Sequence, residues 1–246
     1  MEADRLEYPI NSAFIRIVAA GNVLPAFWAH PDTGGMFPGL VVIHDQSGLT
    51  AFIRRLVRRL AQAGHYVIAP DLFNQQHVDA THTARQLAAS MGETGPPYVA
   101  AAIGAVATHN HCNGDIALFG LGLGGTLALY LAAHRDDLKA AIAINGDPQP
   151  VMTLLPAAST PILALYDAGS GGVTAEARTA FQAALEAAPP DHALVTYPAA
   201  GRDFFDDTQP GHDRSAANDA WVRALDFLAA RLAGPSQPPD IRMQRL

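Results

Sequence analysis

Short apolar runs alternate with amphipathic segments along this chain. Residues 40–44 and 66–71 are rich in β-branched side chains, which is typical of strands buried in a parallel sheet. Between these runs, apolar residues of segment 51–63 recur every three or four positions, and arginines occupy the other positions. This spacing predicts an amphipathic helix, with Thr50 as its N-terminal cap.

The same reasoning predicts an alternation of strands and helices along the whole chain. Strands are expected at residues 14–18, 26–29, 40–44, 66–71, around 116, 138–144, 161–166 and 192–197. Helices are expected at 51–63, 83–90, 97–108, from the turn after residue 121 to about 133, and at 174–187 and 216–232. This order predicts an α/β fold with a mostly parallel sheet covered by helices on both faces. No polar linker divides the chain, so we expect one domain over residues 1–233 and a C-terminal extension over 234–246.

Composition and charge limit which kinds of molecule this protein is expected to bind and in which cell compartment we expect it. The 246 residues are 49% hydrophobic and carry a net charge of -7, which argues against nucleic acids and anionic membranes as partners. The only cysteine is Cys112, the first residues lack a secretory pattern, and the apolar runs are too short to span a bilayer. We therefore expect a cytoplasmic protein, monomeric or homodimeric, that binds a small molecule.

A glycine-rich turn follows the apolar segment at residues 116–121. The pattern Gly120-x-Gly122-x-Gly124 has the layout of a nucleophile elbow, in which a strand, a sharp turn and a helix present a nucleophile at the middle position. Here the middle position is Gly122, which has no side chain. The turn therefore offers no group that attacks a carbonyl.

Several longer motifs resemble the dienelactone hydrolase family of α/β-hydrolases. The resemblance covers about residues 14–232 and rests on motifs in the family's order. They are Val-Val-Ile-His-Asp-Gln-Ser-Gly-Leu at 41–49, Tyr-Val-Ile-Ala-Pro-Asp-Leu-Phe at 66–73, the elbow, Tyr-Pro-Ala-Ala-Gly at 197–201 and Ala-Trp-Val-Arg-Ala-Leu-Asp-Phe-Leu at 220–228. The resemblance implies an α/β-hydrolase fold.

The resemblance also implies that the catalytic triad is substituted. The family's cysteine nucleophile falls at Gly122, its acid at Ser170 and its histidine at Arg202. The positions of arginines that bind anionic lactones in the family fall at Gln75 and Asp206. Because a triad acts as a unit, this pattern predicts that triad hydrolysis is lost.

Other parts of an active site are expected to remain. The backbone N–H groups of Gln46 and Leu123 fall where the fold forms its oxyanion hole. Asp45 falls at a family glutamate and is a candidate general base, while Arg202 and Asp203 form either an ion pair or a ligand-binding pair. Further candidates for the pocket are His44, Gln75, His77 and Asp206.

Alternative interpretations of these motifs are weaker. Gly120, Gly122 and Gly125 also fit a dinucleotide-binding fingerprint, with Asp147 as its acid, although that motif normally opens the first βαβ unit. His109, His111 and Cys112 resemble part of a zinc site but lack a second ligand pair. Neither a cofactor nor a metal is therefore expected.

These observations predict a non-hydrolytic enzyme, such as an isomerase, cyclase or lyase, that acts on a small carbonyl compound. The alternative is a catalytically inactive pseudoenzyme that serves as a binding or scaffolding subunit. A hydrolase with an atypical site is a further alternative.

Overall fold

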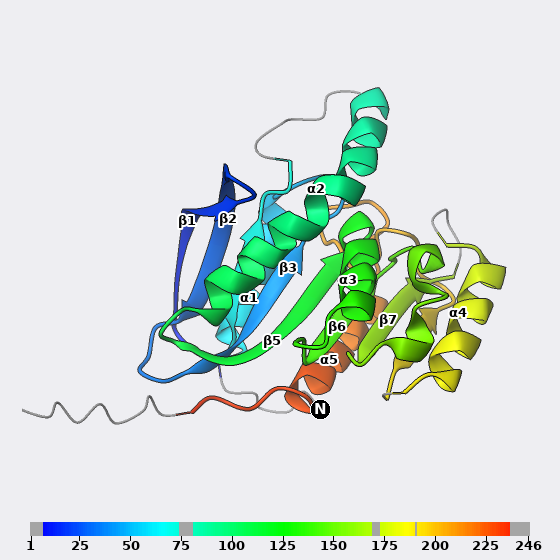
Figure 1. The fold of residues 1–246 in the computed structure, drawn as a ribbon. Helices are drawn as coiled ribbons and strands as arrows, with labels where there is room; N and C mark the ends of the chain where they lie inside the picture. The colour runs from blue at the N-terminus through cyan, green and yellow to red at the C-terminus, as the bar shows by residue number, and fades with distance from the viewer. Residues whose placement is uncertain (1–6, 74–80, 169–172, 190, 237–246) are drawn as a thin grey trace, which may run out of the picture.

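A single eight-stranded sheet forms the centre of the protein (Figure 1). The computed structural model describes residues 7–73, 81–168, 173–189 and 191–236, with the backbone alone at 81–91 and 93. The strands are β1 (Ile10–Ala19), β2 (Asn22–Pro31), β3 (Phe37–Ile43), β4 (Tyr66–Pro70), β5 (Cys112–Leu121), β6 (Ala140–Ile144), β7 (Ile162–Asp167) and β8 (Ala193–Tyr197). Their order is β1-β2-β4-β3-β5-β6-β7-β8. Only the β1–β2 and β2–β4 pairings are antiparallel, and the other five are parallel, so the predicted mostly parallel sheet is confirmed.

Helices cover both faces of this sheet, as predicted. On one face α2 (Thr81–Ala107), α3 (Leu123–His134) and α4 (Ala175–Ala187) pack over one hydrophobic cluster. On the other face α1 (Ala51–Gln62) and α5 (Arg214–Ala229) pack over a second cluster. In Figure 1, α2 and α3 lie in front of the sheet and α5 lies behind it.

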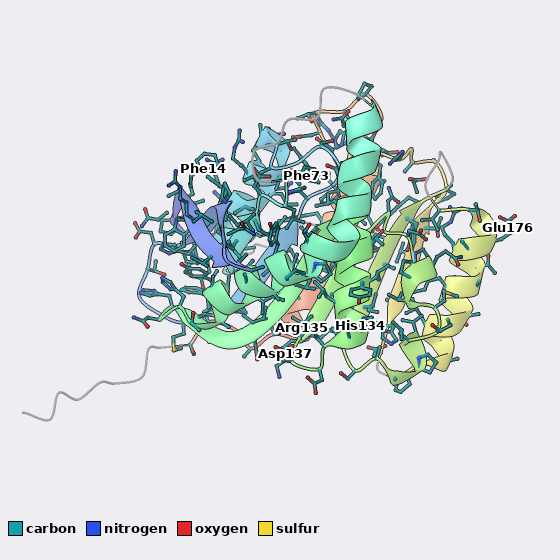
Figure 2. The ribbon with its side chains drawn as sticks, turned by 45° about the horizontal axis from the view of Figure 1, so that its top comes forward. Phe14, Phe73, His134, Arg135, Asp137 and Glu176 are labelled. Carbon is teal, nitrogen blue, oxygen red and sulfur yellow. The ribbon has the colours of Figure 1, made fainter. Side chains whose placement is uncertain are left out.

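The central strands are apolar because both of their faces are covered. Every residue of β3, β4, β6 and β7 is buried. The edge strand β1 is largely exposed, and Phe14, labelled in Figure 2, lies there with 65% of its surface accessible. The buried strands thus lie in the middle of the sheet, and their carboxyl ends share one edge.

Helix α1 begins at the predicted residue. The side chain of Thr50 accepts a hydrogen bond from the backbone N–H of Ile53 at 3.4 Å, which caps the first turn. The apolar stripe of the helix, including Leu56 and Leu60, is buried against the sheet. This packing fixes the segment that immediately precedes it, residues 44–50.

The prediction of two helices between residues 83 and 108 is wrong. One helix, α2, runs from Thr81 to Ala107 and contains Pro96 and Pro97. Figure 1 shows α2 changing direction along its length. Because proline removes a backbone donor and clashes with the preceding turn, a kink is its expected effect, and here the helix bends instead of ending.

The described segment after α5 returns to the sheet just before β3. Met36 and Ser236 exchange two backbone hydrogen bonds, of 2.7 and 2.9 Å, in an isolated bridge. The predicted boundary between residues 233 and 234 stays a prediction. No helix in the described part of the chain is long and apolar enough to cross a membrane.

Candidate active site

The connection between β5 and α3 is a sharp turn with Gly122 at its apex. Gly122 adopts φ 51° and ψ −115°, a conformation in the positive-φ region that strongly favours glycine. Its N–H donates to the carbonyl of Ile144 at 2.8 Å, and its own carbonyl accepts from the N–H of Thr126 at 3.0 Å. The turn is thus held to the adjacent strand and to the first turn of α3.

The neighbouring glycines are required by close packing of the backbone. A Cβ atom on Gly120 would lie 2.1 Å from the carbonyl oxygen of Gly124. A Cβ atom on Gly124 would lie 2.2 Å from the carbonyl oxygen of Ile43. Packing between strand and helix therefore accounts for the glycine spacing that also fits a dinucleotide fingerprint.

A cavity of about 360 Å³ opens beside this turn. It is formed where the carboxyl ends of β3, β5, β6 and β7 meet, which is where open α/β sheets bind ligands. The residues that line it are Asp45, Gln46, Ser47, Thr50, Phe52, Ile53, Leu121, Gly122, Leu123, Thr126, Ile144, Asn145, Asp147, Tyr166, Asp167, Val173, Arg178, Arg202, Asp203, Phe205, Asp206 and Gln209. The cavity thus brings Gly122 together with most of the described site candidates.

Asp45 faces the apex of the turn. A Cβ atom on Gly122 would lie 3.3 Å from the Cβ of Asp45, so the direction in which residue 122 would project points at this side chain. One carboxylate oxygen of Asp45 accepts the N–H of Ser47 at 2.8 Å. Burial raises the pKa of Asp45, and the charge of Asp206 adds to the rise, whereas the hydrogen bonds from Ser47 oppose it.

Two backbone amides border the same space. Leu123 is the first residue of α3, and Gln46 follows Asp45 on the loop after β3. Within the described residues, neither amide donates a hydrogen bond to another group. Both are therefore available to a ligand, and the positive end of the α3 dipole adds to the potential at Leu123.

The loop after β8 supplies the opposite wall. Arg202, Asp203 and Asp206 all line the cavity. The carboxylate of Asp206 accepts the N–H and the hydroxyl of Thr208, at 2.8 and 2.6 Å. This wall therefore carries charges of both signs.

Two residues of the site were missed by sequence reasoning. Asn145 donates from Nδ2 to the carbonyl of Arg202 at 2.7 Å and accepts the N–H of Asp167 at 2.9 Å. Arg178 is buried and donates to the carbonyls of Val173 and Ala168, at 2.6 and 3.0 Å.

The sequence does contain a signal for Arg178. It shares the buried side of α4 with Phe181 and Leu185, at helical spacing, so it is a charged residue on an otherwise apolar stripe. A charge at such a position needs partners inside the protein. For Asn145, the position directly after β6 is the only comparable signal.

His44 lies behind the cavity and does not line it. Its side chain is fully buried, and its Nε2 accepts the N–H of Leu72 at 3.0 Å. Nδ1 therefore carries the proton and donates to the carbonyl of Asp45 at 2.7 Å. Burial lowers the pKa of His44, which favours this neutral form, and Phe73, labelled in Figure 2, packs against the ring with centroids 4.9 Å apart.

Other candidates lie elsewhere. Gln75, His77 and Ser170 fall outside the described residues. Cys112 begins β5, whereas Gly122 follows its other end, so the segment with His109 and His111 lies away from the cavity. In the described part of the chain, no three His, Cys, Asp or Glu side chains are grouped so that they could hold a metal ion.

The sheet order and the sharp turn between β5 and α3 define an α/β-hydrolase fold. A crystal structure described as “Putative Dienelactone Hydrolase from Klebsiella pneumoniae subsp. pneumoniae MGH 78578” superposes with a TM-score of 0.83 at 27% identity, covering 90% of this chain and 99% of that one. A family model for the dienelactone hydrolase family matches residues 24–232. The chain belongs to the dienelactone hydrolase family.

Similar curated sequences carry the name of a hydrolase. A relative from Yersinia pestis is 31% identical, with 86% of this chain and 85% of the relative covered. A relative from Salmonella typhi is 29% identical, with 89% and 87% covered. Both are named “Putative carboxymethylenebutenolidase”.

These comparisons contradict the predicted function. The expectation of a non-hydrolytic isomerase, cyclase or lyase, and the alternative of an inactive pseudoenzyme, are both wrong, since the family and its named relatives are hydrolases. The error was to equate a missing side-chain nucleophile with a missing hydrolytic reaction. Hydrolysis requires an activated nucleophile, and water activated by a general base is one.

Proposed function

We propose that this protein is a hydrolase of small esters or lactones in which water, and not a side chain, attacks the carbonyl. The observation that carries the proposal is the position of Asp45, whose Cβ lies 3.3 Å from where a Cβ of residue 122 would be. A water molecule held by the Asp45 carboxylate would occupy the space that a nucleophilic side chain leaves empty at Gly122.

The electrostatic environment of Asp45 supports a role as general base. A base is most effective when its pKa approaches the working pH, and burial raises the pKa of Asp45 in that direction. The N–H of Ser47 holds one carboxylate oxygen at 2.8 Å and fixes the orientation of the group. The second oxygen is the one that we assign to the water.

In the proposed reaction the water oxygen bonds to the carbonyl carbon while its proton passes to Asp45. The carbonyl oxygen becomes an oxyanion, stabilised by the N–H groups of Gln46 and Leu123. The intermediate then expels the alkoxide, which takes the proton from Asp45, and the products are an acid and an alcohol. In this scheme Arg202 stabilises negative charge, and Asp203 is an alternative site for the proton.

The charge of the cavity favours a neutral substrate. Five aspartates line it, Asp45, Asp147, Asp167, Asp203 and Asp206, against two arginines, Arg178 and Arg202. Arg178 already donates to two backbone carbonyls. Carboxylates around a small cavity repel an anion, so we propose that neutral esters or lactones are preferred over carboxylate-bearing ones.

The proposal is tested by following hydrolysis of p-nitrophenyl acetate and an uncharged butenolide, together with the intact mass of the protein during turnover. We expect steady hydrolysis without an initial burst and without an acyl adduct. Asp45→Asn should lower kcat by about 10²- to 10⁴-fold, the contribution typical of a general base. Asp137→Asn is the matched control. Asp137 pairs with Arg135, and both residues, labelled in Figure 2, lie before β6, at the end of the sheet away from the cavity.

Two outcomes would overturn the proposal in different ways. A trapped acyl adduct on the protein would show that a side chain, and not water, is the nucleophile. The protein would still be a hydrolase. Failure to hydrolyse any ester or lactone, in a correctly folded sample, would remove the hydrolase itself.

We also propose that the protein acts in the cytoplasm. Cys112 is a free cysteine and is buried at the start of β5. A chain with one buried thiol gains no disulfide from an oxidising compartment. Localisation of a tagged full-length chain in fractionated cells tests the proposed cytoplasmic location.

A further inference from the structure

A second cavity lies on the face of the protein formed by α1 and α5. Its volume is about 380 Å³, and it lies between these helices and the loop that precedes α5. The residues that line it are Phe52, Arg55, Leu56, Arg59, Phe205, Asp207, His212, Arg214, Ala217 and Asn218. We call this cavity the α1–α5 groove.

Positive charge gathers in the groove although the whole chain carries a net charge of -7. Three guanidinium groups line it, those of Arg55, Arg59 and Arg214. Asp207 is the one carboxylate among the lining residues, and it pairs with Arg55. Asp207 also interacts with Arg59 through its charge, so one carboxylate faces three guanidinium groups in the lining and leaves an excess of positive charge.

Arg59 is held in place by an aromatic ring. Its guanidinium carbon lies 4.2 Å from the centre of the Trp221 ring. Partial burial lowers the pKa of Arg59, with the charges of Asp207 and Glu7 opposing this effect. A stacked and partly desolvated guanidinium is preorganised for the oxygens of a carboxylate or phosphate, since its N–H groups keep fixed directions.

His212 adds a further polar group to the groove. Its Nδ1 lies 2.9 Å from the carbonyl oxygen of Phe204, which only accepts, so Nδ1 carries a proton. In the neutral ring Nε2 then accepts, so it can take a hydrogen bond from a donor group of a ligand but not contact an anionic oxygen.

Apart from Asn218, the remaining lining residues are apolar. They are Phe52, Leu56, Phe205 and Ala217, and the rings of Phe52 and Phe205 meet edge to face with centroids 6.1 Å apart. Phe52 and Phe205 also line the cavity beside Gly122, so they separate the two spaces. An apolar surface next to guanidinium groups suits a ligand that has both an apolar body and an anionic group.

We propose that the α1–α5 groove binds a small organic anion, a phosphate or carboxylate attached to an aromatic or aliphatic group. The anionic group contacts Arg55, Arg59 and Arg214, and the apolar body lies on Phe52, Leu56 and Phe205. Because Asp207 pairs with Arg55, the ligand competes with this carboxylate. The site is separate from the proposed hydrolytic site and does not depend on its chemistry.

The test is isothermal titration calorimetry of the full chain with phenylphosphonate, phenylacetate and inorganic phosphate. We expect phenylphosphonate or phenylacetate to bind at least about tenfold more tightly than inorganic phosphate, because only they bury a ring. The tighter of the two aromatic probes identifies the anionic group. Equal or tighter binding of inorganic phosphate would contradict the role given to the apolar surface.

Variants with opposite expected effects separate the groove from general charge attraction. Arg55→Ala and Arg214→Ala should each weaken binding by about tenfold, the scale of one charge-assisted hydrogen bond. Asp207→Asn should tighten it, because Arg55 is released. Arg16→Ala, an equal charge change on the exposed strand β1, should leave binding unchanged.

The proposal is overturned if none of the three probes binds at millimolar concentration. It is also overturned if Arg16→Ala weakens binding as much as Arg214→Ala does. Circular dichroism of each variant shows whether it is folded. If folded Asp207→Asn binds the probe no more tightly than the wild type does, the ligand does not compete with Asp207 for Arg55.

Discussion

Asn145 ties the loop of Arg202 to the end of the sheet. Its Nδ2 donates to the carbonyl of Arg202 at 2.7 Å, and its Oδ1 accepts the N–H of Asp167 at 2.9 Å. One side chain thereby links the segments that follow β6 and β8 to the last residue of β7. Asn145 has φ 52°, a conformation that asparagine tolerates better than most residues.

Replacing Asn145 should therefore loosen the wall that carries Arg202 and Asp203. For Asn145→Ala we expect a loss of about 2–3 kcal/mol in the free energy of unfolding, from two lost hydrogen bonds and the unfavourable φ. Asn145→Gly loses the same bonds without the strain, so it should be the more stable of the two. Denaturant unfolding measures both, and equal stability of wild type and Asn145→Ala would contradict this role.

The rate of hydrolysis should rise with pH. A general base acts when it is deprotonated, and burial raises the pKa of Asp45, so kcat/KM should increase through a pH above the usual range of aspartate and then level off. The negative charge of Asp206 contributes to the raised pKa of Asp45. Asp206→Asn should thus shift the limb to lower pH, whereas Asp137→Asn should not; a rate that falls with pH would exclude Asp45 as the base.

The same pKa shift makes a prediction for stability. Because the folded-state pKa of Asp45 is raised, the folded protein binds this proton more tightly than the unfolded chain does, and ionisation of the group costs stability as pH rises. Asp45→Asn removes that cost and should raise the midpoint of thermal unfolding at pH 7. A lower midpoint for this variant would show that the Asp45 carboxylate stabilises the fold.

Gly120 should be intolerant of any side chain. A methyl group there would lie 2.1 Å from the backbone oxygen of Gly124, so Gly120→Ala forces strand and helix apart. We expect a loss of about 3 kcal/mol or more, as for severe overpacking. Gly104→Ala is the matched control in α2, where an added Cβ would have no described neighbour within 4 Å beyond the backbone of its own helix, and it should be neutral or stabilising by up to about 1 kcal/mol.

Gly122→Ala tests the space assigned to the attacking water. The added methyl group would lie 3.3 Å from Asp45, and residue 122 must keep φ 51°, so a stability loss of about 1–3 kcal/mol is expected. Displacement of the water should lower kcat by at least about tenfold. Unchanged turnover by a folded Gly122→Ala would place the attacking water elsewhere.

The sequence predicted the sheet, the helices other than α2, and the turn because each depends on local patterns. Buried parallel strands are continuous apolar runs, and the Thr50 cap and the apolar stripe of α1 follow from spacing alone. The Pro96-Pro97 pair misled the prediction for α2, because tertiary packing overrides a local helix-breaking tendency.

Within the site, the sequence predicted the residues that belong to recognisable motifs. It did not predict the residues whose role depends on contacts between segments distant in sequence. Asp45, Gln46, Gly122 and Leu123 lie on recognisable strand ends and turns. Asn145 and Arg178 act through bonds to loops distant in sequence, such as that between Asn145 and Arg202. Function was mispredicted because substitution at the three triad positions was taken to rule out hydrolysis.

The packing around the turn has a practical consequence for enzyme engineering. Gly120 and Gly124 are locked against backbone oxygens, whereas a Cβ at position 122 would meet only the Asp45 side chain within 4 Å among the described residues. Position 122 is thus the one of these three glycines at which a side chain fits on a rigid frame, at the cost of the strain that φ 51° imposes. Serine or cysteine grafted there would be displayed in a nearly fixed direction, which makes this chain a scaffold for comparing side-chain and solvent nucleophiles at a single location.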